Sequence, residues 1–199
     1  MAASSDGGDA RVHRLMALTP ELELELRDAK ERAGSFLGAA KVAAFNGWSV
    51  GFFAVVSILF GLFSLTSFLV GVGLAFVARN EFVGRARLRQ LDPSGLELLW
   101  RNQLGLLALI IAYCVWSIYR TVAAPDPQIL ADLTELLGEG VEDLIRSLTL
   151  TLYALVIAAT GIFQGLTARY YFVRVSMIRG YVRDTPQWVL DLQRATVME

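Results

Sequence analysis

The chain has 199 residues, a formal net charge of −1 and a charged fraction of 19%, below the ~25% typical of soluble domains. Its hydrophobic fraction is 55% with Tyr counted and Gly left out; with Gly counted in place of Tyr it is roughly 60%, against the ~45–50% expected of a soluble domain. This composition excludes intrinsic disorder and an ordinary soluble enzyme, and the absence of a basic excess argues against nucleic-acid binding.

The first segment, residues 1–18, lacks the basic start and apolar core of a signal peptide, so we expect a disordered tail. Thr19 and Pro20 are typical of a helix start, since Thr caps a helix and Pro suits its first position. We therefore expect an amphipathic helix over 19–37. The alternating Glu-Leu run at 21–26 also fits a strand, but no partner strand is nearby, which favours the helix.

Residues 42–77 carry no charged side chain. As one helix they would extend about 54 Å, whereas the hydrocarbon layer of a bilayer is about 30 Å thick. The chain must therefore double back, and Gly and Ser near the middle of the run predict a turn at 61–65. To give the first span enough length, we extend it back to about Gly38, with Lys41 reaching the head groups.

Two further apolar spans follow at 103–119 and 148–168. Aromatic and basic residues flank the first of them, as expected at membrane interfaces. Leucines spaced by three and four between the spans predict an amphipathic helix over 127–148, weakened midway by Gly138 and Gly140.

These patterns predict an all-α integral membrane protein with four transmembrane helices and amphipathic flanking helices. In chain order, the expected segments are a disordered cytoplasmic tail (1–18), a cytoplasmic amphipathic helix (19–37), the first span (38–60), an outer turn (61–65), the second span (66–83), a basic cytoplasmic loop (84–102), the third span (103–119), an acidic extracytoplasmic loop with an amphipathic helix (120–147), the fourth span (148–168) and a cytoplasmic C-terminal segment (169–199).

The distribution of basic residues predicts the orientation. Of the 18 Lys and Arg residues, only Arg120 and Arg146 flank the acidic loop. Because basic residues accumulate on the cytoplasmic side of membrane proteins, both termini are expected in the cytoplasm, and the simplest location is a bacterial cytoplasmic (inner) membrane.

Little in the sequence points to catalysis. His13 is the only histidine, which excludes a histidine-based zinc site and a Ser-His-Asp triad, and we expect no cofactor. Cys114 is expected to serve as a small apolar group within the third span. No span holds Asp, Glu, Lys, Arg or His away from its ends, which argues against a proton-driven carrier.

Small residues at every fourth position are the clearest positive signal. Such stripes allow close approach of helices in lipid, either within the chain or with a membrane-protein partner or a second copy. The stripe residues are Ala39, Ala43, Gly47, Gly51, Ser67, Gly71, Ala75, Gly161 and Gly165. A basic patch of Arg85, Arg87 and Arg89 either sets topology only or contacts anionic lipid or an acidic partner.

Three functions remain open. The leading hypothesis is a non-enzymatic accessory, scaffold or assembly component, whose partners are the bilayer and other proteins. The second is a passive channel or small-solute carrier subunit, lined by the uncharged polar residues Asn46, Ser49, Thr151, Thr160 and Gln164. The length of the apolar run at 42–77 is similar to that of the wedge hairpins of membrane-curving proteins, which implies curvature shaping as the third.

Overall fold

The structure is a computed structural model that describes residues 19–123, 127–138 and 140–197. These residues form helices and no strands. The helices are α2 (Pro20–Phe60), α3 (Leu65–Arg89), α4 (Ser94–Val122), α5 (Pro127–Leu137), α6 (Val141–Asp184) and α7 (Gln187–Val197). The tail expected at 1–18, with His13, lies outside the described residues.

Four of these helices, α2, α3, α4 and α6, are long and apolar enough to span a membrane, which confirms the predicted fold class. In the most apolar 18-residue window of α6, none of the residues is buried, and exposed aromatic and aliphatic side chains cover α2 and α3 as well. In water such surfaces would be costly, whereas in a bilayer they face lipid tails.

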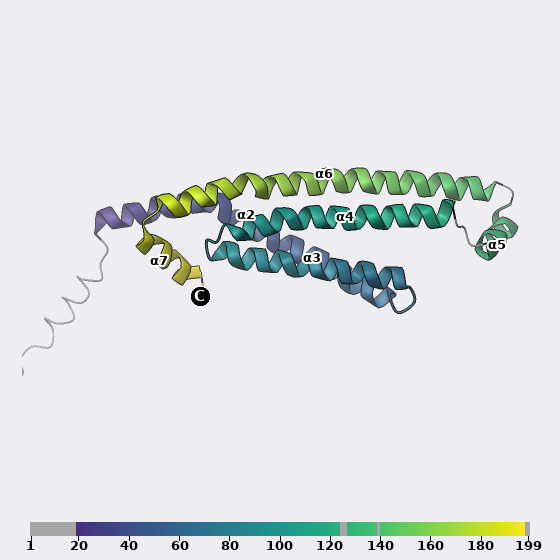
Figure 1. Cartoon of the computed structure of the whole chain (residues 1–199), viewed down its shortest axis with the longest axis horizontal. Coiled ribbons are helices and arrows are strands. Elements are labelled where there is room, and N and C mark those ends of the chain that lie inside the picture. The colour runs from purple at the N-terminus through teal and green to yellow at the C-terminus, as the bar shows by residue number, and fades with distance from the viewer. Residues whose placement is uncertain (1–18, 124–126, 139, 198–199) are drawn as a thin grey trace, which may run out of the picture.

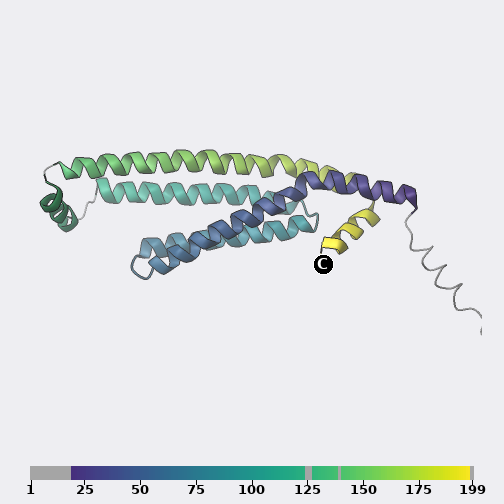
Figure 2. The ribbon, with the colours of Figure 1, turned by 180° about the vertical axis from the view of Figure 1, so that it is seen from behind.

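The four long helices form two antiparallel pairs. The predicted turn joins α2 to α3, since α2 ends at Phe60 and the Ser64 hydroxyl caps α3 by accepting from the Ser67 amide. The second pair consists of α4 and α6, with α5 at its far end. Figures 1 and 2 show that the pairs lie close together where α3 turns into α4 and diverge toward the α2–α3 turn. We call the end where α3 turns into α4 the α7 end of the bundle. The opposite end, toward the α2–α3 turn, is the α5 end.

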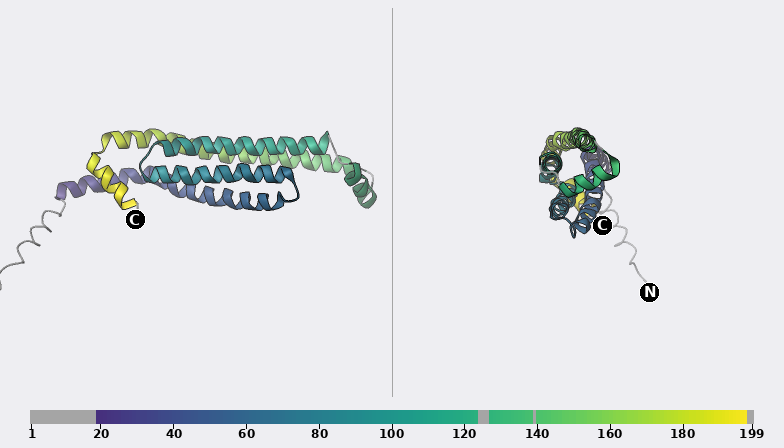
Figure 3. Two further views of the ribbon diagram at one scale, coloured as in Figure 1. Left: turned by 60° about the horizontal axis from the view of Figure 1, so that its bottom comes forward. Right: turned by 90° about the vertical axis from the view of Figure 1, so that its right-hand side faces the viewer.

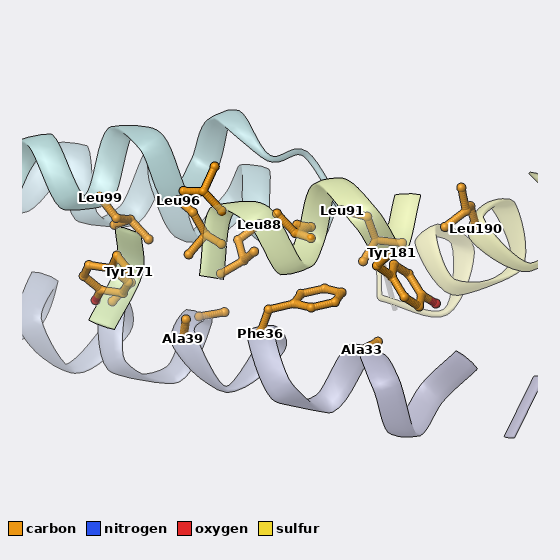
Figure 4. Close-up of a cluster of buried hydrophobic side chains, with 14 of the residues drawn as sticks. Ala33, Phe36, Ala39, Leu88, Leu91, Leu96, Leu99, Tyr171, Tyr181 and Leu190 are labelled. Carbon is orange, nitrogen blue, oxygen red and sulfur yellow. The ribbon is translucent and has the colours of Figure 1, made fainter. Parts of the chain in front are cut away.

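The largest buried cluster lies at the α7 end. There α6 and α2 run past the α3–α4 turn, and α7 folds back beside them (Figures 1 and 3). In Figure 4, Phe36 of α2 and Tyr181 of α6 face each other, with ring centroids 5.2 Å apart. This α7-end core consists of Ala29, Ala33, Phe36, Ala39, Ala40, Ala43, Leu88, Leu91, Leu96, Leu99, Tyr171, Val175, Ile178, Tyr181, Val189 and Leu190.

Two boundaries expected from the sequence, at the start of the first span and at the end of the fourth, lie inside continuous helices. The segments 19–37 and 38–60 are one continuous helix, α2, whose start is capped by Thr19 as predicted. The fourth span likewise continues without a break to Asp184. At about 1.5 Å per residue, α2 and α6 are ~62 and ~66 Å long, so each extends roughly 30 Å beyond a hydrocarbon layer.

The prediction of a single amphipathic helix over 127–148 is wrong. Gly138 and Gly140 have φ angles of 88° and 92°, a left-handed conformation that side-chain-bearing residues rarely adopt. They end α5 and precede Val141, where α6 begins. The two glycines therefore break the leucine stripe into two helices.

Candidate functional site

A cavity of about 500 Å³ lies between the two helix pairs and is the candidate functional site. All four long helices contribute to its wall. The lining residues are Asn46, Ser49, Val50, Phe53 and Ser57 of α2, Val70 and Leu74 of α3, Gln103, Leu106, Leu109, Ile110 and Tyr113 of α4, and Phe163, Gln164 and Thr167 of α6. Its volume falls within the ~300–1,000 Å³ range of small-molecule sites.

The polar groups of this cavity concentrate toward the α7 end. The amides of Asn46, Gln103 and Gln164 and the hydroxyls of Ser49 and Thr167 are found there. Farther toward the α5 end the wall is mainly aliphatic and aromatic, and its polar groups there are the hydroxyls of Ser57 and Tyr113. Among the described residues that line the cavity, none is charged. Amides and hydroxyls both donate and accept hydrogen bonds, so this wall suits a neutral polar group.

The mouth of the cavity is marked by two phenylalanines. Phe53 of α2 and Phe163 of α6 line the cavity, yet their side chains are 60% and 70% exposed. Both helices carry exposed apolar residues at this height, so the opening faces the lipid-exposed side of the bundle.

A buried carboxyl group holds the polar end of the wall in place. Glu81 of α3 is fully buried, and its Oε1 accepts from Asn102 Nδ2 at 2.7 Å and from Gln103 Nε2 at 2.8 Å. Asn102 also donates to the carbonyl of Val77 at 3.0 Å, and its Oδ1 accepts from Asn80. Because Gln103 lines the cavity, Glu81 fixes the orientation of a cavity side chain without lining the cavity itself.

The second oxygen of this carboxyl group, Oε2, is buried and has no hydrogen-bond partner among the described residues. The close packing of α2 explains the burial, since a Cβ added at Gly47 would lie 3.2 Å from the Glu81 Cβ. Next to Gly47 in the chain, Asn46 donates to the hydroxyl of the fully buried Tyr171 at 3.5 Å, which links α2 to α6 at the same height.

The structure brings together three of the five polar residues singled out in the sequence. Asn46, Ser49 and Gln164 line the cavity. Thr160 is half-buried and Thr151 is exposed, and neither is part of the cavity wall.

Small residues of the first two stripes lie where α2 and α3 approach most closely. A Cβ added at Gly71 would lie 2.7 Å from Ile58 Cγ1, and one at Gly51 would lie 3.7 Å from the Ala78 Cβ. Ala39, Ala43 and Gly47 are buried on the same helix pair, Ser67 is half-buried and Ala75 is exposed. A Cβ added at Gly161 or Gly165 would meet no atom within 4 Å, so this pair does not mark a close approach to another described helix.

The basic patch lies at the α7 end. Arg85 is half-buried, Arg87 donates to the Ser94 hydroxyl at 3.5 Å across the α3–α4 turn, and Arg89 borders a small pocket beneath α7. Cys114 is fully buried. In the described part of the chain, no group of three or more His, Cys, Asp or Glu side chains could hold a metal ion.

The sequence reading missed Glu81, Asn102, Gln103 and Tyr171. The available signal was that Asn102 and Gln103 are adjacent at the start of one apolar run and that Glu81 lies near the end of another. Both positions are within a turn of a span end, where polar side chains ordinarily reach the head groups.

Comparisons of the chain with protein-family models, with curated proteins and with solved structures found no match. The function is therefore argued from the cavity and its surroundings.

Proposed function

We propose that the chain is a non-enzymatic accessory protein of the membrane that binds a small amphipathic molecule from the bilayer. The observation that carries this proposal is the cavity, whose amides lie toward one end, whose other end is mainly apolar, and whose wall includes the exposed side chains of Phe53 and Phe163. In this proposal the neutral head group of the ligand meets Asn46, Gln103 and Gln164, while its apolar part lies along Leu109 and Ile110.

The α7-end core supports the accessory part of the proposal. It forms a packed body from α2, α6, α7 and the α3–α4 turn, and most of its residues lie outside the four spans expected from the sequence. A rigid body attached to a ligand-binding bundle has a surface on which a partner protein can assemble. The partner class remains the one expected from the sequence, a membrane protein or a second copy.

The binding proposal is tested with a long-chain primary alcohol that carries a photoactivatable diazirine, added to the protein in phosphatidylcholine vesicles. We expect crosslinks to map to the cavity wall. Val50→Trp fills the cavity and should lower this labelling about tenfold, which corresponds to ~1.4 kcal/mol of binding free energy. Val55→Trp, on the same helix with a 59% exposed side chain, should leave labelling unchanged. Equal labelling of both variants would refute the proposal.

A small-solute carrier is the second candidate, because three residues proposed for a solute path lie together in the cavity. Solute flux through liposomes containing the purified protein separates the two functions. Flux that is abolished by Asn46→Leu with Gln164→Leu supports a carrier, whereas crosslinking without flux supports the accessory protein.

We further propose a bacterial inner membrane as the location, with both termini in the cytoplasm. The basic residues at the α7 end support this orientation. Reporter fusions after Glu142 and after Glu199 test it: only the first is expected to give an extracytoplasmic signal. An extracytoplasmic signal from the second fusion would reverse the orientation.

A further inference from the structure

A second pocket, of about 190 Å³, lies within the α7 end, where α2, the end of α3 and α7 meet. Its apolar wall consists of Ala33, Leu37 and Leu91. Its polar wall includes Lys30 of α2, Arg89 of α3 and Gln193 of α7. This pocket is separate from the cavity between the helix pairs and shares no lining residue with it.

Gln193 supplies a buried hydrogen-bond donor that nothing in the described chain uses. The residue is only 7% exposed, and its Oε1 accepts from the hydroxyl of Tyr181 at 2.7 Å. This bond leaves Nε2 as the group available to the pocket, and Nε2 has no partner among the described residues. An unpaired buried donor costs about 1–3 kcal/mol, so a ligand that accepts its hydrogen bond gains that free energy.

Two cationic side chains line the same pocket as this donor. Lys30 and Arg89 line the pocket from two different helices, and no acidic side chain is among its described lining residues. Arg89 has another interaction of its own, so the argument depends on Lys30 and Gln193, with Arg89 adding its charge. Ammonium, guanidinium and amide N–H groups that converge on one point form the donor set that binds oxyanions.

The position of the pocket selects a soluble ligand over a lipid. Lys30 precedes the first span, which begins at about Gly38, by about 12 Å along α2, at 1.5 Å per residue. The head-group region adds only ~5–8 Å on each side of the hydrocarbon layer. The apolar wall of the pocket reaches the span at Leu37, but a phosphate in the head-group region would lie short of Lys30.

We propose that this pocket binds a small soluble oxyanion of the phosphate class. The anion is held by Gln193 Nε2 and by the charges of Lys30 and Arg89. Because these groups belong to α7, α2 and α3, the bound anion connects all three helices. Binding therefore stabilises α7 against the body of the protein and links the packing of this helix to the concentration of the anion.

Thermal unfolding of the full-length protein in detergent tests the proposal, with inorganic phosphate titrated against chloride at constant ionic strength. A ligand that binds only the folded state raises the unfolding temperature in a saturable way. We expect Lys30→Gln to weaken the apparent affinity for phosphate at least about tenfold. Gln193→Glu, which retains an acceptor for Tyr181 but replaces the donor with an acidic group, should abolish the effect.

Arg27→Gln is the matched control, since Arg27 is an exposed cation on α2 that does not line the pocket. It removes the same charge and should leave the phosphate response unchanged. A response that is absent from the native protein, or equal in all three variants, would overturn the proposal. Stabilisation only by vesicles of phosphatidic acid would also overturn it, because the ligand would then be a lipid.

Discussion

Replacing Gly95 with alanine is expected to open the contact between α3 and α4. A Cβ at this position would lie 2.7 Å from the carbonyl oxygen of Gly84 and 2.8 Å from the amide nitrogen of Leu88. Both are backbone atoms, so no side chain can rotate out of the way. Overpacking usually costs ~1–3 kcal/mol, and we expect a loss near 3 kcal/mol in the free energy of unfolding, measured by circular dichroism during denaturation in detergent.

Gly105→Ala provides the control for this substitution on the same helix. A Cβ at Gly105 would meet no atom within 4 Å, so the variant is expected to be as stable as the native protein or up to ~1 kcal/mol more stable. If the alanine variants at positions 95 and 105 were equally stable, α3 and α4 would not approach each other as closely as the structure places them.

The α2–α3 turn was predictable from the sequence, whereas the break between α5 and α6 was not. The reversal at 61–64 follows from the mismatch between a long apolar run and the thickness of a bilayer. The α3–α4 turn contains Asp92, whose carboxylate accepts from the Ser94 amide at 2.9 Å. This bond requires only neighbouring residues, although the whole of 84–102 was expected to be a loop.

The extents of the long helices were not predictable from the same signals. The boundary expected between residues 37 and 38 marks a change from a polar to an apolar surface, and the residues on both sides favour a helix. The side chains change from polar to apolar at this boundary, but the backbone hydrogen bonds continue through α2. Composition therefore indicates which residues are apolar enough to face lipid. Capping residues and glycines with positive φ angles indicate where helices begin and end.

The candidate site was predictable in part. Asn46, Ser49 and Gln164 stand out because they are polar residues inside apolar runs. Glu81 and Gln103 do not stand out, because polar residues near span ends ordinarily reach water or head groups. Their burial depends on the approach of α3 to α4, which brings together residues 22 positions apart in the chain. The spacing of residues within one helix therefore does not predict this contact between two helices.

Replacing Glu81 with leucine is expected to destabilise the bundle and disturb the cavity together. The substitution removes the acceptor of Gln103 Nε2 and leaves a buried donor unpaired, at a cost of about 1–3 kcal/mol in the free energy of unfolding. Asn102 retains the carbonyl of Val77 as an acceptor. Because Gln103 then loses its fixed orientation, crosslinking of the diazirine alcohol to the cavity wall should also fall.

Two further variants identify the cause of this effect. Glu81→Gln keeps a carbonyl oxygen for both amides and removes the acidic group, so it should be more stable than Glu81→Leu and retain labelling. Combining Glu81→Leu with Gln103→Leu removes both partners, and replacing a buried hydrogen-bonded pair by apolar groups is often nearly neutral. The double variant should therefore recover most of the stability without recovering labelling. If Glu81→Gln were as unstable as Glu81→Leu, the acidic group itself would be required, and the acceptor role assigned to Oε1 would be insufficient.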